Sequence, residues 1–133
     1  MPFRRCPTPA DADASIAALR SADKTGAKAG DGLFLFFGST DPGTGQSWCP
    51  DCAVADPVLR SAIARQRGDL TTYECPVGER SAWKGNAEHP YRLHPAFRVQ
   101  RIPTLIRFAG GSEIGRLVEA DCADSARVAA FLG

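Results

Sequence analysis

A run of five apolar residues, 33–37, restricts the fold of this chain more than any other segment. The run reads Leu-Phe-Leu-Phe-Phe and has a glycine on each side. A strand with one face in water alternates apolar and polar residues, whereas a short continuous apolar run is typical of a strand buried on both faces of a sheet. Such strands belong to parallel sheets with helices on both sides. The run therefore predicts an α/β fold.

The remaining segments supply helices and strands in an order that fits this fold. Asp11 or Asp13 is expected to cap a helix that ends near Lys24. A second helix should begin at the Cys-x-x-Cys pair and end near Gln66, with a kink at Pro57. Further strands are predicted at 70–75, 104–109 and 113–118, loops at 38–47 and 76–88, a short helix at 89–97 and a last helix at 123–132. This order predicts a mixed β-sheet with helices on both faces.

Length and composition describe one ordinary globular domain. The 133 residues are 44% hydrophobic and 23% charged, with a formal net charge of +1 and with lysines and arginines scattered along the chain. This distribution argues against nucleic acid or a membrane surface as a partner, and the longest apolar run is far too short to span a membrane. We expect a monomer with one domain at 11–133. Residues 1–10 should form an N-terminal arm, either loose or paired as a short edge strand.

The cysteine count bears on the compartment. Five cysteines are an odd number, which argues against a closed disulfide framework and for a reducing environment. The arginines near the N-terminus are not followed by the apolar stretch of a secretory signal, so a cytoplasmic location is expected. Cys6, in the arm, is expected to be exposed and without a role. Cys75 and Cys122 are expected to be inert core residues, the alternative being a second, regulatory thiol pair.

The chemistry is concentrated in Trp48-Cys49-Pro50-Asp51-Cys52. Two cysteines at this spacing, between a buried strand and a helix, indicate a thioredoxin-like redox motif. Backbone N–H groups at a helix N-terminus favour the thiolate of Cys49, the form that attacks a disulfide, and Cys52 can then resolve the mixed disulfide. Asp51 is the candidate proton relay, although its charge opposes the thiolate. Trp48 should form an apolar wall beside the sulfur, and Pro50 suits the first helical turn.

A zinc site is the competing interpretation of the two cysteines. Structural zinc takes four ligands, and the chain has no second Cys-x-x-Cys pair, so Cys75 and His94 would have to be recruited. We therefore expect no metal. Neither His89 nor His94 is expected to have a catalytic role, because histidines in such positions are most often solvated or lie at helix ends.

A second informative segment is Arg101-Ile102-Pro103-Thr104. A proline directly before a strand is a candidate for a cis peptide bond. If Pro103 faces the cysteines, the backbone of Ile102 offers a strand-like edge to a bound disulfide. We therefore predict Ile102, Pro103 and Thr104 as substrate contacts. Trp83 is a further candidate, which either lines the rim of the site or anchors its own loop.

With Trp48-Cys49-Pro50-Asp51-Cys52 before a helix and Ile102-Pro103-Thr104 before a hairpin, the chain resembles the thioredoxin superfamily. Two further segments indicate a particular family within this superfamily. The loop at 38–47 and the run 75–84, which contains Val-Gly-Glu and Trp-Lys, are similar to those of the thioredoxin domain-containing protein 17 family. The similarity covers about residues 33–132. It implies a thioredoxin fold with Cys49 as nucleophile, Cys52 as resolving thiol and Pro103 as cis-proline.

The resemblance also implies an activity. Members of this family are cytosolic disulfide reductases that receive electrons from NADPH through thioredoxin reductase. They act on small disulfides such as cystine and on selected protein disulfides, and they are associated with reduction of nitrosothiols, persulfides and peroxide. No bound cofactor is expected beyond the redox-active disulfide Cys49–Cys52. The long loops at 38–47 and 76–88 are expected to exclude many partners of ordinary thioredoxin.

Two departures from the thioredoxin pattern accompany this resemblance. Ordinary thioredoxin has a buried aspartate in the strand before its active site, whereas residues 33–37 contain no ionisable group. Asp51 is then the nearest substitute as proton acceptor for Cys52. The arm, with Cys6, matches no known part of the family. The rival to a reductase is a non-catalytic interaction module whose dithiol senses redox state.

Overall fold

The computed structural model describes residues 2–22 and 30–133 of the chain. The strands in these residues form one sheet in the order β1-β3-β2-β4-β5. They span, in chain order, β1 Phe3–Arg5, β2 Gly32–Phe37, β3 Thr71–Pro76, β4 Thr104–Ala109 and β5 Ser112–Val118. β3 runs parallel to both β1 and β2, whereas β4 is antiparallel to β2 and to β5. The predicted mixed sheet is confirmed.

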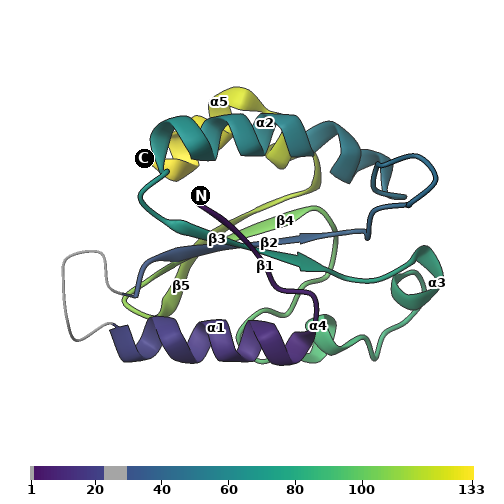
Figure 1. Ribbon diagram of the computed structural model, residues 1–133, viewed down its shortest axis with the longest axis horizontal. Coiled ribbons are helices and arrows are strands. Elements are labelled where there is room, and N and C mark those ends of the chain that lie inside the picture. Colours follow the sequence, from purple (N-terminus) through teal and green to yellow (C-terminus); the bar gives the residue numbers. More distant parts are fainter. Residues whose placement is uncertain (1, 23–29) are drawn as a thin grey trace.

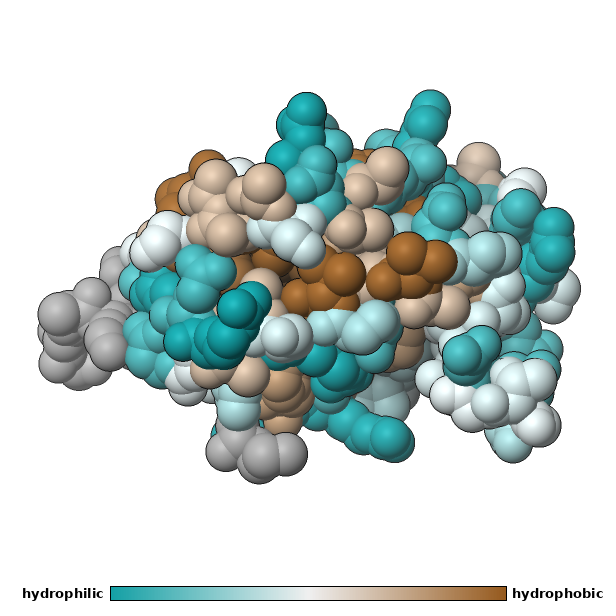
Figure 2. Space-filling view, turned by 90° about the horizontal axis from the view of Figure 1, so that it is seen from above, coloured by the Kyte–Doolittle hydropathy of each residue, from teal (hydrophilic) through white to brown (hydrophobic). Residues whose placement is uncertain are grey.

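Helices cover both faces of this sheet, with α2 and α5 on one face and α1 and α4 on the other (Figure 1). The helices span α1 Pro9–Ala22, α2 Pro50–Gln66, α3 Arg80–Trp83, α4 Pro90–Leu93, the 3-10 helix η1 Glu119–Ala123 and α5 Ser125–Leu132. Viewed from the α2 and α5 side, apolar side chains form a narrow band between hydrophilic ones (Figure 2). The two-sided cover confirms the predicted fold class.

β2 lies inside the sheet, between β3 and β4. This interior position explains why residues 33–37 are all apolar. Leu33 and Leu35 belong to the apolar cluster beneath α2 and α5, whereas Phe34 and Phe36 belong to the cluster on the α1 and α4 side. At most 2% of each of these side chains is exposed. Burial of each contributes about 1.5–3 kcal/mol, which holds this segment in the interior. The two-sided burial predicted from the sequence is confirmed.

Four element predictions need correction or lie outside the described residues. The segment 76–88, expected to be a polar loop, contains the short helix α3, and the helix expected at 89–97 ends at Leu93. The last helix begins at Ser125 rather than 123, because the Asp124 carboxylate accepts hydrogen bonds from the first amides of the helix. The helix end expected near Lys24 lies outside the described residues. Pro57 lies inside α2, and the kink there stays a prediction.

The N-terminal residues form a short edge strand, which was one of the two structures expected for the arm. β1 pairs in parallel with β3, with Phe3 opposite Thr72 and Arg5 opposite Glu74. The Cys6 amide continues this pairing by donating to the Glu74 carbonyl at 2.8 Å. Cys6 is only 2% exposed, so the expectation that it is exposed is wrong. The reason is the pairing itself, which places Cys6 on the inner face of the sheet beneath α1, where its thiol lies 3.2 Å from the Ser15 hydroxyl.

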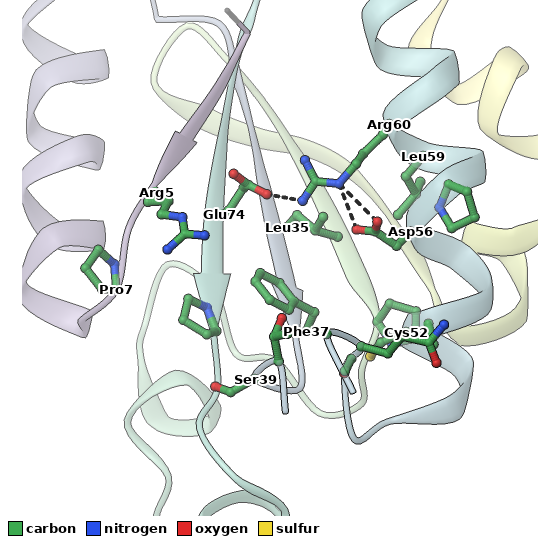
Figure 3. Close-up of a pocket in the computed structure, with 18 residues that line it drawn as sticks. Arg5, Pro7, Leu35, Phe37, Ser39, Cys52, Asp56, Leu59, Arg60 and Glu74 are labelled. Carbon is green, nitrogen blue, oxygen red and sulfur yellow. Dashed lines mark hydrogen bonds and ion pairs between the residues drawn. The ribbon is translucent and has the colours of Figure 1, made fainter. Parts of the chain in front are cut away.

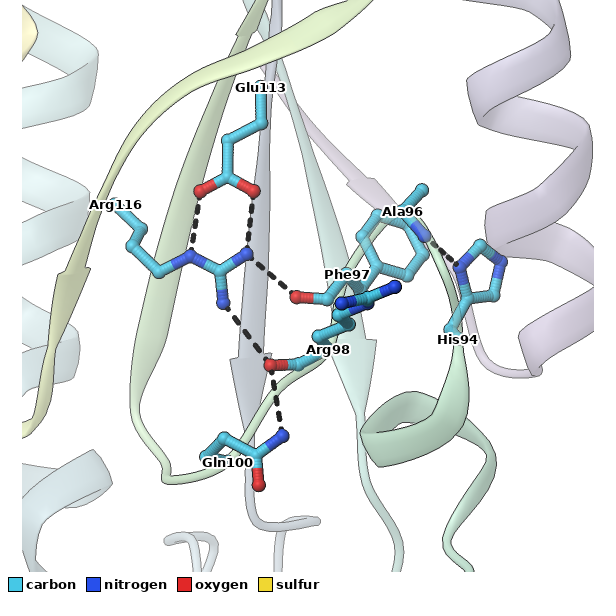
Figure 4. A network of polar contacts seen from close by, with 7 residues as sticks. All are labelled: His94, Ala96, Phe97, Arg98, Gln100, Glu113 and Arg116. Carbon is cyan, nitrogen blue, oxygen red and sulfur yellow. Dashed lines mark hydrogen bonds and ion pairs between the residues drawn. The ribbon is translucent and has the colours of Figure 1, made fainter.

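A polar network holds the loop that precedes β4 (Figure 4). Arg116 of β5 pairs with Glu113 through two hydrogen bonds, of 2.7 and 2.6 Å. The same guanidinium donates to the backbone carbonyls of Phe97, at 2.7 Å, and Arg98, at 3.4 Å. These contacts fasten the loop to the sheet a few residues before Ile102. These hydrogen bonds therefore hold in place the backbone from which the segment containing Ile102 extends toward the cysteines.

Candidate active site

The two cysteines of the Cys-x-x-Cys pair lie at the N-terminus of α2. Cys49 is the N-cap residue, and its Sγ accepts a hydrogen bond from the Cys52 amide at 3.3 Å. Pro50 occupies the first turn, where its missing N–H leaves no bond unmade. Both cysteines are free thiols, 6% and 3% exposed. The structure therefore presents a dithiol with one sulfur aimed at the unpaired amides of a helix terminus.

Trp48 connects this helix terminus to the two long loops. Its indole N–H donates to the Gly78 carbonyl at 2.8 Å. Its ring lies so close to Gly38 that a Cβ on that glycine would be 2.6 Å from the Trp48 Cε2 atom. The Ser47 hydroxyl donates to the Gly38 carbonyl at 2.6 Å and accepts from the Cys49 amide at 3.1 Å. The tryptophan is half-buried and lines the same depression as Cys49, and its role as an apolar wall stays a prediction.

The Ile102–Pro103 peptide bond is cis, as expected. The Ile102 carbonyl oxygen lies 4.0 Å from the Cys49 Sγ, so this segment faces the first cysteine. The Pro103 carbonyl turns the other way and accepts from the Glu119 amide at 2.7 Å. Thr104 is buried, and its hydroxyl donates to the Arg101 carbonyl at 2.5 Å. The structure thus brings Ile102 to the sulfur, whereas the Thr104 side chain is engaged within the segment.

A shallow depression of about 440 Å³ opens beside Cys49. Its lining includes Trp48, Cys49, Pro50, Asp51, Trp83 and Ile102, together with Arg80, Lys84, Arg92, Arg101 and Glu119. Four of these residues are cationic and two are acidic. Arg101 pairs with Glu119 at 2.8 Å, whereas Arg80 and Lys84 are both exposed. The depression therefore has a positive rim next to the candidate nucleophile.

Trp83 lines this depression and also anchors its loop, so both interpretations of the sequence apply. The side chain is 4% exposed, and the Arg92 guanidinium lies 3.7 Å from the centre of its ring. His89 packs edge-on against the same ring and caps α4 by accepting from the Tyr91 amide through Nδ1. His89 is a helix-end residue as expected, but it is buried, because its Nε2 donates to the Val77 carbonyl at 2.7 Å.

Cys52 lines a second, deeper cavity of about 550 Å³ between α2 and the ends of β2 and β3 (Figure 3). Arg60 reaches across it, with Nε 3.0 Å from both carboxylate oxygens of Asp56 and with Nη2 hydrogen-bonded to Glu74. Burial, reinforced by a hydrogen bond with Cys49, raises the pKa of the Cys52 thiol well above its usual value of 9.0. Cys52 is therefore a protonated thiol at neutral pH.

The two carboxylates nearest the dithiol in sequence lie on different sides of it. Asp51 is exposed and lines the shallow depression with Cys49, whereas Asp56 lines the deep cavity with Cys52. The role of Asp51 as proton relay for Cys52 stays a prediction. Sequence reasoning missed Asp56 and Glu74. The spacing of Cys52, Asp56 and Arg60, four residues apart each time, places them along one face of a helix and is a signal that could have found Asp56.

Two of the three cysteines outside the pair, Cys75 and Cys122, occupy opposite faces of the sheet. Cys75 and Cys122 are both fully buried, in the clusters on the α1 side and the α2 side respectively. The burial expected for them is confirmed, and a pair between them is wrong, because the sheet separates them. Cys122 lies behind the cis-proline, with its thiol 3.7 Å from the Pro103 carbonyl. Burial raises the pKa of Cys122 to about 12.

Two further properties concern metals and membranes. Within residues 2–22 and 30–133, His, Cys, Asp and Glu side chains do not gather in threes as a metal site would require. His94, the histidine considered as a zinc ligand, is paired with Asp13 at 2.5 Å. Among the helices of the described part of the chain, none has the length and apolar character needed to cross a membrane.

The sheet order, the dithiol at the start of α2 and the cis peptide opposite it define a thioredoxin-fold protein with a Cys-x-x-Cys site. Comparison with solved structures supports this fold. Thioredoxin O2 from Arabidopsis thaliana in the oxidized state is similar with a TM-score of 0.65, over 98% of this chain and 91% of that chain, at 19% sequence identity.

The sequence comparisons identify the family. Residues 13–133 match the thioredoxin domain of the thioredoxin domain-containing protein 17-like family. The chain is 35% identical over 109 residues to thioredoxin-like protein Clot from Arabidopsis thaliana, which covers 82% of this chain and 79% of the relative. It is 35% identical over 91 residues to thioredoxin domain-containing protein 17 from Homo sapiens, covering 68% of each. The chain belongs to the thioredoxin domain-containing protein 17-like family, as its motifs predicted.

Proposed function

We propose that this protein is a disulfide reductase that acts by dithiol–disulfide exchange through Cys49 and Cys52. The observation that carries the proposal is the position of the Cys49 sulfur, between the amides at the start of α2 and the Ile102 carbonyl, with the Cys52 thiol behind it. Cys49 lines the depression from which a substrate would approach, whereas Cys52 lines the cavity between α2 and the strand ends. This asymmetry supports separate roles for the two thiols.

The reaction proceeds in two exchanges. The Cys49 thiolate attacks one sulfur of the substrate disulfide, forming a mixed disulfide and releasing the other sulfur as a thiolate that takes a proton. Cys52 then loses its proton and attacks the Cys49 sulfur, which releases the second thiol and leaves the Cys49–Cys52 disulfide. Two electrons pass from the protein to the substrate in each cycle.

The second exchange needs a base, because the pKa of Cys52 is raised by burial. Asp56 lines the same cavity and lies one helical turn beyond Cys52. We assign Asp56 the uptake of the Cys52 proton, with Arg60 orienting its carboxylate through two hydrogen bonds of 3.0 Å. Asp51 is the alternative acceptor on the solvent side.

The substrates we propose are small disulfides such as cystine, together with selected protein disulfides. Cystine carries two carboxylates, and the rim of the depression beside Cys49 includes the exposed cations Arg80 and Lys84. Membership of the family supports regeneration of the dithiol by thioredoxin reductase with electrons from NADPH, and activity toward nitrosothiols, persulfides and peroxide. We propose that the protein works in the cytoplasm as a monomer, with no bound cofactor and with neither nucleic acid nor membrane as a partner.

The test is reduction of cystine and of insulin in the presence of NADPH and thioredoxin reductase. Cys49→Ser should abolish turnover, and Cys122→Ala, the matched control that removes a buried cysteine outside the Cys-x-x-Cys pair, should leave it intact. Cys52→Ser should accumulate a mixed disulfide at Cys49, seen as one substrate thiol added to the intact mass. If the native protein shows no turnover and Cys49→Ser does not affect its binding to a partner, the protein is a non-catalytic interaction module and the proposal is wrong.

A further inference from the structure

A second pair of cysteines, Cys6 and Cys75, lies close together on the α1 side of the sheet. Cys6 directly follows β1, and Cys75 lies in β3. Arg5 is opposite Glu74 in the parallel register, so the next position along both strands places Cys6 beside Cys75. The Cys6 amide donates to the Glu74 carbonyl at 2.8 Å, which keeps the strands paired at that point. Both side chains belong to the same buried cluster.

This placement satisfies the distance that a disulfide requires. Neighbouring strands lie about 4.8 Å apart, and the Cα atoms of disulfide-bonded cysteines lie about 4.4–6.8 Å apart. Both side chains are on the α1 side of the sheet, 2% and 0% exposed. The two sulfurs are therefore within reach of each other without movement of the sheet.

The surroundings make the two thiols chemically unequal. The neighbouring Cys75 thiol lowers the pKa of Cys6 to about 7, against the opposing effect of burial, and the Ser15 hydroxyl, 3.2 Å from the Cys6 sulfur, acts in the same direction as Cys75. The proximity of Cys6, together with burial, strongly raises the pKa of Cys75. A thiolate next to a protonated thiol is the arrangement in which one sulfur is oxidised first and the other then resolves it.

We propose that Cys6 and Cys75 form a second redox-active dithiol, which a small peroxide oxidises to a disulfide that fastens the N-terminal strand to β3. With hydrogen peroxide, the Cys6 thiolate attacks one oxygen, the O–O bond breaks, and with one proton the products are Cys6 sulfenic acid and water. The Cys75 sulfur then attacks the Cys6 sulfur, the S–O bond breaks, and the hydroxyl leaves with the Cys75 proton as a second water. The two thiols supply the two electrons that reduce the peroxide.

Access to the pair comes through the sheet edge. β1 pairs with β3 over only three residues and is the edge strand of the sheet that residues 2–22 and 30–133 form. Short edge elements open at lower free energy than the core of a domain, so Cys6 becomes reachable without global unfolding. The disulfide would close a loop from residue 6 to residue 75, which stabilises the fold by restricting the unfolded chain. This pair is distinct from the site beside Cys49 and does not depend on the proposed reductase activity.

The experiment uses the full chain with Cys49→Ser, Cys52→Ser and Cys122→Ala, so that Cys6 and Cys75 are its remaining thiols. Treatment of the folded protein with hydrogen peroxide should remove two hydrogen atoms from the intact mass, and dithiothreitol should restore them. Tryptic digestion without reduction should yield one species that joins peptides 6–20 and 68–80. The oxidised form should also unfold at a higher urea concentration than the reduced form.

The control adds Cys6→Ser to this background, which should abolish both the mass loss and the joined peptide while the circular dichroism spectrum stays unchanged. Oxygen added to Cys6 without a joined peptide would overturn the proposal, because it would mean that Cys75 cannot resolve the sulfenic acid. Oxidation only after unfolding in urea, or no oxidation at all, would overturn it as well.

Discussion

Replacing Gly38 by alanine tests whether the close approach of Trp48 positions the site. Gly38 follows β2, and its φ is not in the left-handed region, so the backbone itself accepts alanine. The added Cβ, however, would lie 2.6 Å from Trp48 Cε2 and 2.9 Å from Cζ2. Ordinary carbon–carbon contacts are about 3.5–4.0 Å, so the indole must move by roughly 1 Å. The move would strain or break its 2.8 Å hydrogen bond to Gly78.

The expected loss follows from these two effects. Overpacking of this kind costs about 1–3 kcal/mol, and the hydrogen bond contributes about 1 kcal/mol. Gly38→Ala should therefore lower the free energy of unfolding by about 2–4 kcal/mol, measured by urea denaturation with the slope unchanged. In the same variant the Trp48 indole N–H should lose protection in hydrogen exchange.

A double-mutant cycle with Trp48→Leu isolates the cause. Without the indole ring, Gly38→Ala should be within about 1 kcal/mol of neutral or slightly stabilising, because alanine restricts the unfolded chain. If Gly38→Ala is equally destabilising with and without the ring, the clash with Trp48 is not the reason. If it is harmless in the native background, the tryptophan is not packed against Gly38 as described.

Three other substitutions test the site and its surroundings. Lys84→Glu should raise the KM for cystine about 3- to 10-fold with little change in kcat, and this effect should weaken as salt screens the charge. Lys84→Gln, the control, should raise the KM less. An unchanged KM in Lys84→Glu would show that Lys84 does not contact the substrate. Asp56→Asn should slow the release of the second thiol by Cys52 about 100-fold at neutral pH, and less as the pH rises; a uniform loss at every pH would indicate a structural role. Burial raises the pKa of Cys122 from 9.0 to about 12 in the folded chain. The stability that the protonated Cys122 thiol contributes is therefore complete below about pH 9. Above that pH this contribution declines, by up to about 1.4 kcal/mol per pH unit. Cys122→Ala should remove that part of the slope in urea denaturation between about pH 8 and pH 10, and an identical slope would show that Cys122 does not contribute.

Local patterns were sufficient for the features that depend on neighbours in sequence. A run of five apolar residues predicted β2, because a strand with two buried faces admits no polar side chain. The Cys-x-x-Cys pair followed by Pro50 predicted the start of α2, and a proline before a strand predicted the cis peptide at Pro103. Each of these depends on dihedral preferences or side-chain periodicity within a few residues.

The features that depend on distant pairing could not be predicted in the same way. Cys6 is buried because residues 3–5 pair with a strand almost seventy positions later, and nothing local to Cys6 indicates that partner. Glu74 likewise enters the cavity behind Cys52 through the neighbour relation of β2 and β3, which places it opposite Leu35. The helix α3 was missed because a single turn has too few residues to show a period.

The two long loops bear on more than the choice of substrate, because both contact Trp48. The loop at 76–88 accepts the indole N–H through Gly78, and the loop at 38–47 supplies Ser47, whose hydroxyl joins the Gly38 carbonyl to the Cys49 amide. If the loops only excluded partners, shortening either one would widen the range of substrates and leave the rate with cystine unchanged. Because the loops also hold the tryptophan and the amide beside the reacting sulfur, a shortened loop should lower the rate with cystine as well. Selectivity and reactivity are therefore coupled through the same few hydrogen bonds.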